Sequence, residues 1–167
     1  MESDRRPDID SSSVRVVAYD PEAFAQAATE LGARYDEGGS VRVLFAGGTR
    51  DAHQRALAAL AEHTVENIHQ FALSALVKER RMQTQSSIRK AFDAAAEEGA
   101  LLFFDEVDML FDWHHPDSLG GAEEPSSVEY FFQRVEAFDG VVVLALEAPE
   151  HIEAARPYGI HLIVDFR

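Results

Sequence analysis

The chain has 167 residues, 46% of them hydrophobic, which is enough to bury the core of one domain. Its 30 acidic residues outnumber its 15 lysines and arginines, and the formal net charge of −15 argues against binding to the phosphate backbone of nucleic acids. It has no cysteine, no apolar stretch long enough to cross a membrane and no signal peptide, so we expect a cytoplasmic protein without disulfides, thiolate metal sites or a membrane partner.

The amino-terminal part divides into a leader and a first strand and helix. Residues 1–13 are polar and lack periodicity, so we predict a flexible leader there and a single domain over residues 14–167. Residues 14–18 are a short strand candidate, and the pair Asp20-Pro21 then starts a helix. The sequence leaves open whether residues 14–31, which hold this strand and helix, pack on the core or mediate contacts.

The rest of the chain alternates strands and helices. We predict strands at residues 41–46, 101–104, 141–146 and 161–166, and helices at residues 52–63, 84–98, 128–138 and 149–155. Between residues 65 and 76 the apolar residues are scattered, so periodicity does not distinguish a strand from a helix. This alternation predicts a three-layer α/β fold, in which a mainly parallel core sheet of five strands is covered by helices on both faces.

Two acidic residues follow a strongly apolar strand. The run Leu101-Leu102-Phe103-Phe104 ends in Asp105 and Glu106. Four large apolar residues before two carboxylates are typical of the buried strand that carries the Walker B acids of a P-loop ATPase. In an active enzyme of that kind the first acid holds Mg²⁺ through water and the second polarises the attacking water. Asp105 is therefore the candidate metal residue and Glu106 the candidate catalytic residue.

A phosphate-binding loop is expected after the strand at residues 41–46, but its working residues are missing. In the pattern G-x-x-x-x-G-K-[ST], glycines let backbone N–H groups wrap the phosphates, the lysine neutralises them and the hydroxyl holds Mg²⁺. Gly47 keeps the first position and Gly48 follows it. Alanine, His53 and Gln54 stand at the positions of the second glycine, the lysine and the hydroxyl residue. Gly47, Gly48, His53 and Gln54 thus form a degenerate phosphate loop.

Residues 40–166 resemble the large subdomain of AAA+ ATPases, and in particular the group encoded with phage-tail-like contractile injection systems. Residues 105–111, DEVDMLF, are similar to that group's D-E-A-D-A-L-F. Residues 130–141, YFFQRVEAFDGV, are similar to its Y-L-L-Q-R-x-E-A-Y-x-G-x, and IVDF at residues 163–166 is similar to its V-V-D-F. Three blocks in the same order and with near-family spacing are a specific signal. The resemblance implies a P-loop NTPase-like fold and a family activity of ATP hydrolysis.

The same resemblance implies losses at other functional positions. Glu147 stands at the sensor-1 position, where the family has asparagine. Arg80 and Met82 stand where the family's pore loop carries an aromatic residue and a glycine. The arginine-finger positions before the last strand correspond to Pro157, Tyr158, Gly159 and His161. The sequence ends soon after that strand, so we expect no C-terminal helical lid.

These losses predict a weak nucleotide site. ATP carries about four negative charges and would lie beside Asp105, Glu106 and Glu147, while the lysine of the motif has become a histidine, which is mostly neutral at pH 7. One uncompensated charge pair at about 4 Å costs about 4 kcal/mol at an effective dielectric constant of 20. We therefore expect no cofactor, with Mg-ATP as the ligand only if the family activity is retained. Whether the chain is an enzyme is not decided by its sequence.

The interpretation that follows is a catalytically degenerate AAA+ protein acting as a scaffold or regulatory subunit in a contractile injection system or a similar assembly. Its expected partner is a protein, such as a complete AAA+ ATPase or an injection-system component, and it can form oligomers. One alternative is a weakly ATP-binding AAA+ ATPase that is active only in a mixed ring. Another is a metal-binding protein that uses a cluster of acids and histidines, namely Asp105, Glu106, Asp108, Asp112, His114, His115 and Asp117.

Overall fold

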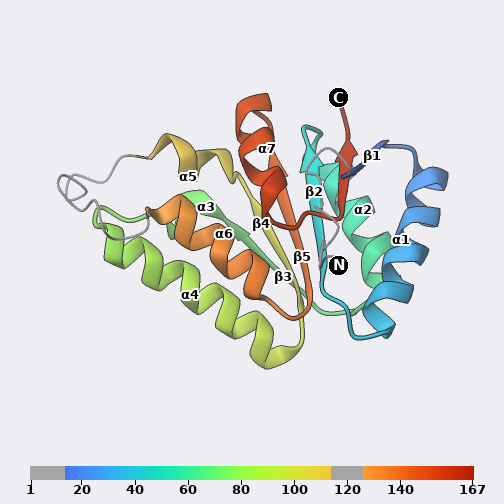
Figure 1. Ribbon diagram of the computed structural model, residues 1–167, viewed down its shortest axis with the longest axis horizontal. Coiled ribbons are helices and arrows are strands. Elements are labelled where there is room, and N and C mark those ends of the chain that lie inside the picture. Colours follow the sequence, from blue (N-terminus) through green and yellow to red (C-terminus); the bar gives the residue numbers. More distant parts are fainter. Residues whose placement is uncertain (1–13, 114–125) are drawn as a thin grey trace, which may run out of the picture.

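The computed structural model describes residues 14–113 and 126–167 (Figure 1). The predicted leader at residues 1–13 lies outside the described residues, as do His114, His115 and Asp117 of the proposed metal cluster. Within the described part of the chain, no helix is long and apolar enough to cross a membrane.

Parallel strands form the sheet at the centre of the fold. They are β1 (Arg15–Ala18), β2 (Val41–Ala46), β3 (Ile68–Ala72), β4 (Leu101–Asp105), β5 (Val141–Leu146) and β6 (Leu162–Asp165). Their order across the sheet is β1-β6-β2-β5-β4-β3, and every neighbouring pair is parallel. β2 and β5 lie in the middle and are almost completely buried, which explains why their sequences are nearly continuous apolar runs.

Helices connect these strands. Those of the described residues are α1 (Pro21–Asp36), α2 (Arg50–His63), α3 (Leu73–Leu76), α4 (Arg81–Glu98), α5 (Asp108–Asp112), α6 (Ser127–Ala137), α7 (Pro149–Ala155) and the short 3-10 helix η3 (Arg156–Tyr158).

The helices cover both faces of the sheet, so the fold has three layers (Figure 1). On one face, α1 and α2 pack on alternate strand residues such as Val43 and Val143. On the other face, helices that include α4, α6 and α7 pack on the residues between them, such as Leu44 and Leu144. The predicted α/β architecture, with a parallel sheet covered on both faces, is confirmed.

The sheet has six strands, so the predicted count of five is wrong. The strand that the sequence left unassigned is β3, whereas β1, the strand candidate at residues 14–18, lies at the edge of the sheet and pairs along its whole length with β6. β1 is short and mostly exposed, with Val16 at 50% exposure, so its sequence carries little of the apolar pattern of a core strand. The helix that follows, α1, buries Phe24, Ala27 and Leu31 in the same apolar cluster as α2. Residues 14–31 therefore belong to the core of the fold.

The structure also assigns a segment that the sequence left open and extends a predicted helix. Residues 65–76, where periodicity was ambiguous, contain both β3 and α3. β3 is the second edge strand and is only partly buried along its length, so no clear apolar alternation marks it. α2 begins at Arg50, two residues earlier than predicted, because the Thr49 side chain caps its first turn by accepting a hydrogen bond from the Ala52 N–H.

A partly buried histidine joins the amino-terminal ends of β2 and β6. His161 Nδ1 accepts a 3.0 Å hydrogen bond from the backbone N–H of Arg42, and the Arg42 guanidinium donates to the carbonyl of Gly159. Burial, followed by the nearby positive charges of Arg34 and Arg42, lowers the pKa of His161 to about 4. The imidazole is therefore neutral in the folded protein at pH 7.

We predict that acid weakens the fold through His161. Because the pKa of His161 is near 6.5 in the unfolded chain, the unfolded state binds the additional proton between pH 6.5 and 4, and the unfolding free energy falls as the pH falls. His161→Asn keeps an acceptor but does not titrate. Between pH 6.5 and pH 4, the unfolding free energy of this variant in urea should fall by about 1–2 kcal/mol less than that of the wild type, after allowance for solvent screening. Equal pH dependence of the two proteins would contradict this role.

Candidate functional site

The predicted site residues meet at the edge of the sheet where its parallel strands end. A cavity of about 460 Å³ opens between the ends of β2, β4 and β5, and its lining consists of Gly47, Gly48, Arg50, His53, Asp105, Glu106, Asp108, Met109, Asp112, Ala145, Leu146 and Glu147. A second cavity of about 270 Å³ adjoins it beside β3 and includes Gln54. Open α/β sheets bind their ligands at the carboxyl ends of their strands, so the candidate site lies here.

The turn between β2 and α2 is short. Only Gly47, Gly48 and Thr49 separate the strand from the helix, and the two glycines have φ angles of +71° and +99°, which favour glycine. The hydroxyl and the carbonyl of Thr49 accept hydrogen bonds from the N–H groups of Ala52 and His53. The predicted strand-to-helix turn is present, with β2 in the interior of the sheet as expected. However, the helix begins where a phosphate loop of the aligned length would still be wrapping its ligand.

The His53 side chain closes this turn from inside. It is 7% exposed, and its Nε2 lies 2.7 Å from the carbonyl oxygen of Gly47. A carbonyl oxygen only accepts hydrogen bonds, so Nε2 carries a proton and donates it to this bond. The imidazole lies against the rings of Phe45, Phe103 and Phe166, at centroid distances of 5.3, 6.0 and 5.1 Å. The residue at the lysine position of the aligned motif thus binds the loop itself.

Phe166 and Arg167, which follow β6, cover the other side of the two glycines. A Cβ built on Gly47 would lie 2.7 Å from Arg167 Cγ, and one built on Gly48 would lie 2.7 Å from Phe166 Cβ. Phe166 also stacks on Tyr19, with ring centroids 4.5 Å apart. The turn is therefore packed on this side by the end of the chain, which Tyr19 supports through Phe166, and both positions favour glycine.

We predict that Gly48→Ala lowers the unfolding free energy by about 2–4 kcal/mol, because alanine at this positive φ is strained and its Cβ meets both Phe166 and the His53 ring. Gly38→Ala is the matched control, since Gly38 has a φ of +86° but a Cβ there would meet no atom within 4 Å. Urea unfolding of the two variants measures the difference. An equal loss in both would show that strain alone, and not the packing of the turn, sets the cost.

Asp105 and Glu106 are held by local hydrogen bonds. Among the described residues other than glycine, Glu106 alone has a positive φ, of +56°. Its backbone N–H donates a 2.8 Å hydrogen bond to Asp105 Oδ1, and its side-chain Oε2 accepts a 2.6 Å hydrogen bond from Ser74 Oγ. Sequence analysis missed Ser74, which lies in the stretch without clear periodicity. The register that pairs Ala72 of β3 with Asp105 of β4 brings it to the site.

Asp108 is a structural carboxylate. Its two oxygens accept hydrogen bonds of 2.8 and 3.0 Å from the backbone N–H groups of Glu147 and Ala148, and His151 Nδ1 lies 2.7 Å from Oδ2. The His151 ring also stacks on Phe111 at a centroid distance of 4.3 Å. These contacts tie the start of α5 to the junction of β5 and α7. They hold the backbone of Glu147 while leaving its side chain exposed.

We predict that Asp108→Ala costs about 2–3 kcal/mol of unfolding free energy, because it leaves two backbone donors and the His151 ring without their partner. Asp112→Ala is the control: this carboxylate is 71% exposed and lies 3.7 Å from His151 Nε2, so its loss should change stability by less than about 0.5 kcal/mol. Chemical denaturation measures both values. Similar losses in the two variants would contradict the structural role of Asp108.

The predicted metal cluster lies only partly within the described residues. Over residues 14–113 and 126–167, no group of three or more histidine, aspartate or glutamate side chains is arranged to hold a metal ion. Asp108 is occupied by the contacts above, and His114, His115 and Asp117 fall outside those ranges.

The cavity is acidic. Five carboxylates line it, those of Asp105, Glu106, Asp108, Asp112 and Glu147, whereas its described lining has one arginine, Arg50, and no lysine. Gln54, at the hydroxyl position of the motif, exchanges hydrogen bonds of 2.9 and 3.1 Å with Gln70. A nucleoside triphosphate would meet more negative than positive charge here.

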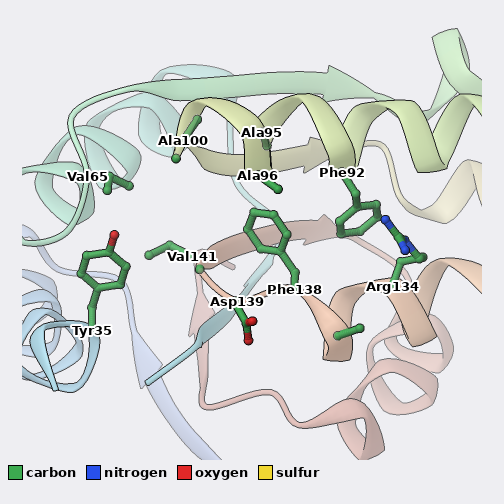
Figure 2. Close-up of a pocket in the computed structure, with 13 residues that line it drawn as sticks. Tyr35, Val65, Phe92, Ala95, Ala96, Ala100, Arg134, Phe138, Asp139 and Val141 are labelled. Carbon is green, nitrogen blue, oxygen red and sulfur yellow. The ribbon is translucent and has the colours of Figure 1, made fainter. Parts of the chain in front are cut away.

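A further cavity, of about 340 Å³, lies at the opposite edge of the sheet beside the first residues of β4 and β5 (Figure 2). Most of its lining residues are apolar, and Arg134 and Asp139 are the charged ones. Figure 2 shows the Arg134 guanidinium beside the ring of Phe92, and the distance from its carbon to the ring centroid is 5.6 Å. Arg134 also pairs with Asp93 at 3.0 Å. Because its main cation is engaged within the protein, this cavity is a weaker candidate than the one at the carboxyl edge.

Comparison with known proteins adds no identification. No protein-family model matches the chain, and no curated protein matches it. Function is therefore argued from the motifs and the geometry of the site.

Proposed function

We propose that the chain is a catalytically degenerate AAA+-like protein that acts as a scaffold or regulatory subunit of a protein assembly, such as a contractile injection system. The three blocks of sequence resemblance support the family. The sheet is also compatible with a P-loop-like α/β fold, and residues from the two motif regions, Gly47, Gly48, Asp105 and Glu106, line one cavity at its carboxyl edge. β1 is an addition to the five-stranded core that the resemblance implies.

The observation that carries the loss of catalysis is the hydrogen bond between His53 Nε2 and the Gly47 carbonyl. In a phosphate loop, the lysine and the backbone N–H groups are directed at the phosphates. In this chain His53 is directed at the loop, and Thr49 occupies the N–H groups of Ala52 and His53. Phosphoryl transfer also depends on positive charge around the transferred group, and the cavity has an excess of carboxylates.

We expect Mg-ATP to raise the melting temperature by less than about 2 °C at a concentration of about 1 mM. A Kd of about 1 mM corresponds to about 0.4 kcal/mol of stabilisation, and each kcal/mol raises the melting temperature by roughly 2–4 °C for a domain of this size. A Kd of about 10 µM would instead give about 2.7 kcal/mol. Differential scanning fluorimetry, with calorimetric titration, distinguishes the two.

Glu106→Gln is the matched control for this experiment, because it keeps the shape of the side chain and removes the charge that activates water. We expect the same small shift in the variant and no ATP hydrolysis in either protein. A shift that implies micromolar affinity, or a hydrolysis rate that Glu106→Gln abolishes, would overturn the proposal of a degenerate site.

One observation favours a second candidate, an ATP-binding AAA+ subunit that is active only in a mixed ring. Glu106 keeps a positive φ and a hydrogen bond from Ser74, and strained residues of this kind cluster at functional sites. In that case a neighbouring complete subunit supplies the positive charges that the cavity lacks. The test is ATP hydrolysis by the assembly that co-purifies with this chain, which Glu106→Gln would then reduce.

A further inference from the structure

The positive charge of the chain is concentrated in one segment. Residues 78–90 contain five of its 15 lysines and arginines but only one of its 30 acidic residues, which gives a formal charge of +4. The remaining 10 cations and 29 acids give the rest of the chain a formal charge of −19. Both lysines of the chain, Lys78 and Lys90, lie in this segment. It is therefore a cationic segment in a chain that is otherwise acidic, and such a segment attracts anionic groups.

The two lysines line one shallow depression along α4. Its volume is about 490 Å³, and its lining, called the α4 stripe below, consists of Lys78, Met82, Gln83, Ser86, Ser87 and Lys90. Met82, Ser86 and Lys90 are four residues apart, so they lie on one face of the helix. The opposite face, which includes Ile88 and Phe92, is buried against the sheet. Figure 1 shows α4 at the rim of its helix layer beside α6.

Within the described part of the chain, few acidic side chains lie close to the lysines of the α4 stripe in sequence, and none forms an ion pair with them. The first acidic residue within α4 is Asp93, and the first turn of the helix has none, so the positive end of the helix dipole is not neutralised by an acid there. Among residues 14–113 and 126–167, neither lysine forms an ion pair with an acid. Met82, between the lysines, is 74% exposed. A cationic surface with an exposed apolar side chain at its centre fits a ligand that has both carboxylates and an apolar group.

We propose that the α4 stripe is a docking surface for a short acidic segment of a partner protein. Carboxylates of that segment contact Lys78 and Lys90, and an apolar side chain covers Met82. The helix rises about 12 Å between residues 82 and 90, which matches a short peptide. A long polyanion such as nucleic acid would extend onto the acidic remainder of the surface and be repelled. The proposal extends the scaffold role by naming a surface and a partner chemistry, and it does not depend on nucleotide binding.

The chain allows a direct test because it has two lysines. Reductive methylation with ¹³C labels Lys78, Lys90 and the α-amino group while keeping their positive charge, and it places NMR reporters at both ends of the α4 stripe. The probe is a short synthetic peptide of glutamates with interspersed leucines. The comparison ligands are the same peptide with serines in place of the leucines and single-stranded DNA of similar length. Mg-ATP binding is measured separately on the same sample. Failure of the docking surface can then be distinguished from failure of the proposed degenerate nucleotide site.

We expect the leucine-containing peptide to shift both lysine signals and to bind more tightly than the serine peptide. Lys90→Glu should weaken its binding by at least about tenfold and Met82→Ser by about threefold, and added salt should weaken it further. Arg55→Glu is the matched control, because it makes the same charge change at an exposed position of α2 and should weaken binding by less than about threefold. Lys78→Gln, at the other end of the stripe, provides a second variant, and thermal melts establish that each is folded.

Four results would overturn the proposal. They are the absence of peptide binding or of lysine shifts, equal weakening by Arg55→Glu, DNA binding as tight as peptide binding, and a concentration-dependent dimer of the chain alone that Lys90→Glu abolishes. The last would assign the α4 stripe to a second copy of the chain.

Discussion

The hydrogen bond from His53 to the Gly47 carbonyl organises the carboxyl edge of the sheet. It joins the end of β2 to the first turn of α2, and it holds the imidazole among three aromatic rings, so that closure of the turn and burial of the ring stabilise each other. Phe166 and Arg167 cover the same glycines from the other side. Because β2 is an interior strand and α2 covers one face of the sheet, this contact also fixes the end of the strand against the first turn of that helix.

The acids of the edge are largely satisfied by the chain itself. Asp108 accepts two backbone N–H groups and contacts His151, Asp105 accepts the N–H of Glu106, and Glu106 accepts the Ser74 hydroxyl. Hydrogen bonds of this kind stabilise carboxylates without a cation or a ligand. These acids therefore have a role in the fold that needs no nucleotide, since they hold turns and strand ends together.

The sequence predicted the interior of the fold better than its edges, for a physical reason. β2 and β5 are buried on both faces, so their apolar runs located them to the residue. The edge strands β1 and β3 are short and partly exposed, so β1 was only a strand candidate and β3 was not assigned. Gly47, Asp105 and Glu106 were found because motif residues follow strands. The hydrogen bond from Ser74 to Glu106 was not predicted, because it depends on the register between two strands. The position of the His53 ring was not predicted either, because it depends on aromatic residues distant in the sequence.

Charges that are satisfied within a chain and charges that face solvent contribute differently to function. A carboxylate that already accepts hydrogen bonds stabilises the fold and offers little affinity to a new ligand, whereas an unpaired surface cation steers and orients an approaching partner. In this protein the first kind is gathered at the carboxyl edge of the sheet, and the second is represented by Lys78 and Lys90, which form no ion pair within residues 14–113 and 126–167. Because the rest of the chain has a formal charge of −19, the positive charge of residues 78–90 contrasts with that of the remaining chain. This separation supports the proposal that a partner docks on the outer face of α4 and not at the edge of the sheet.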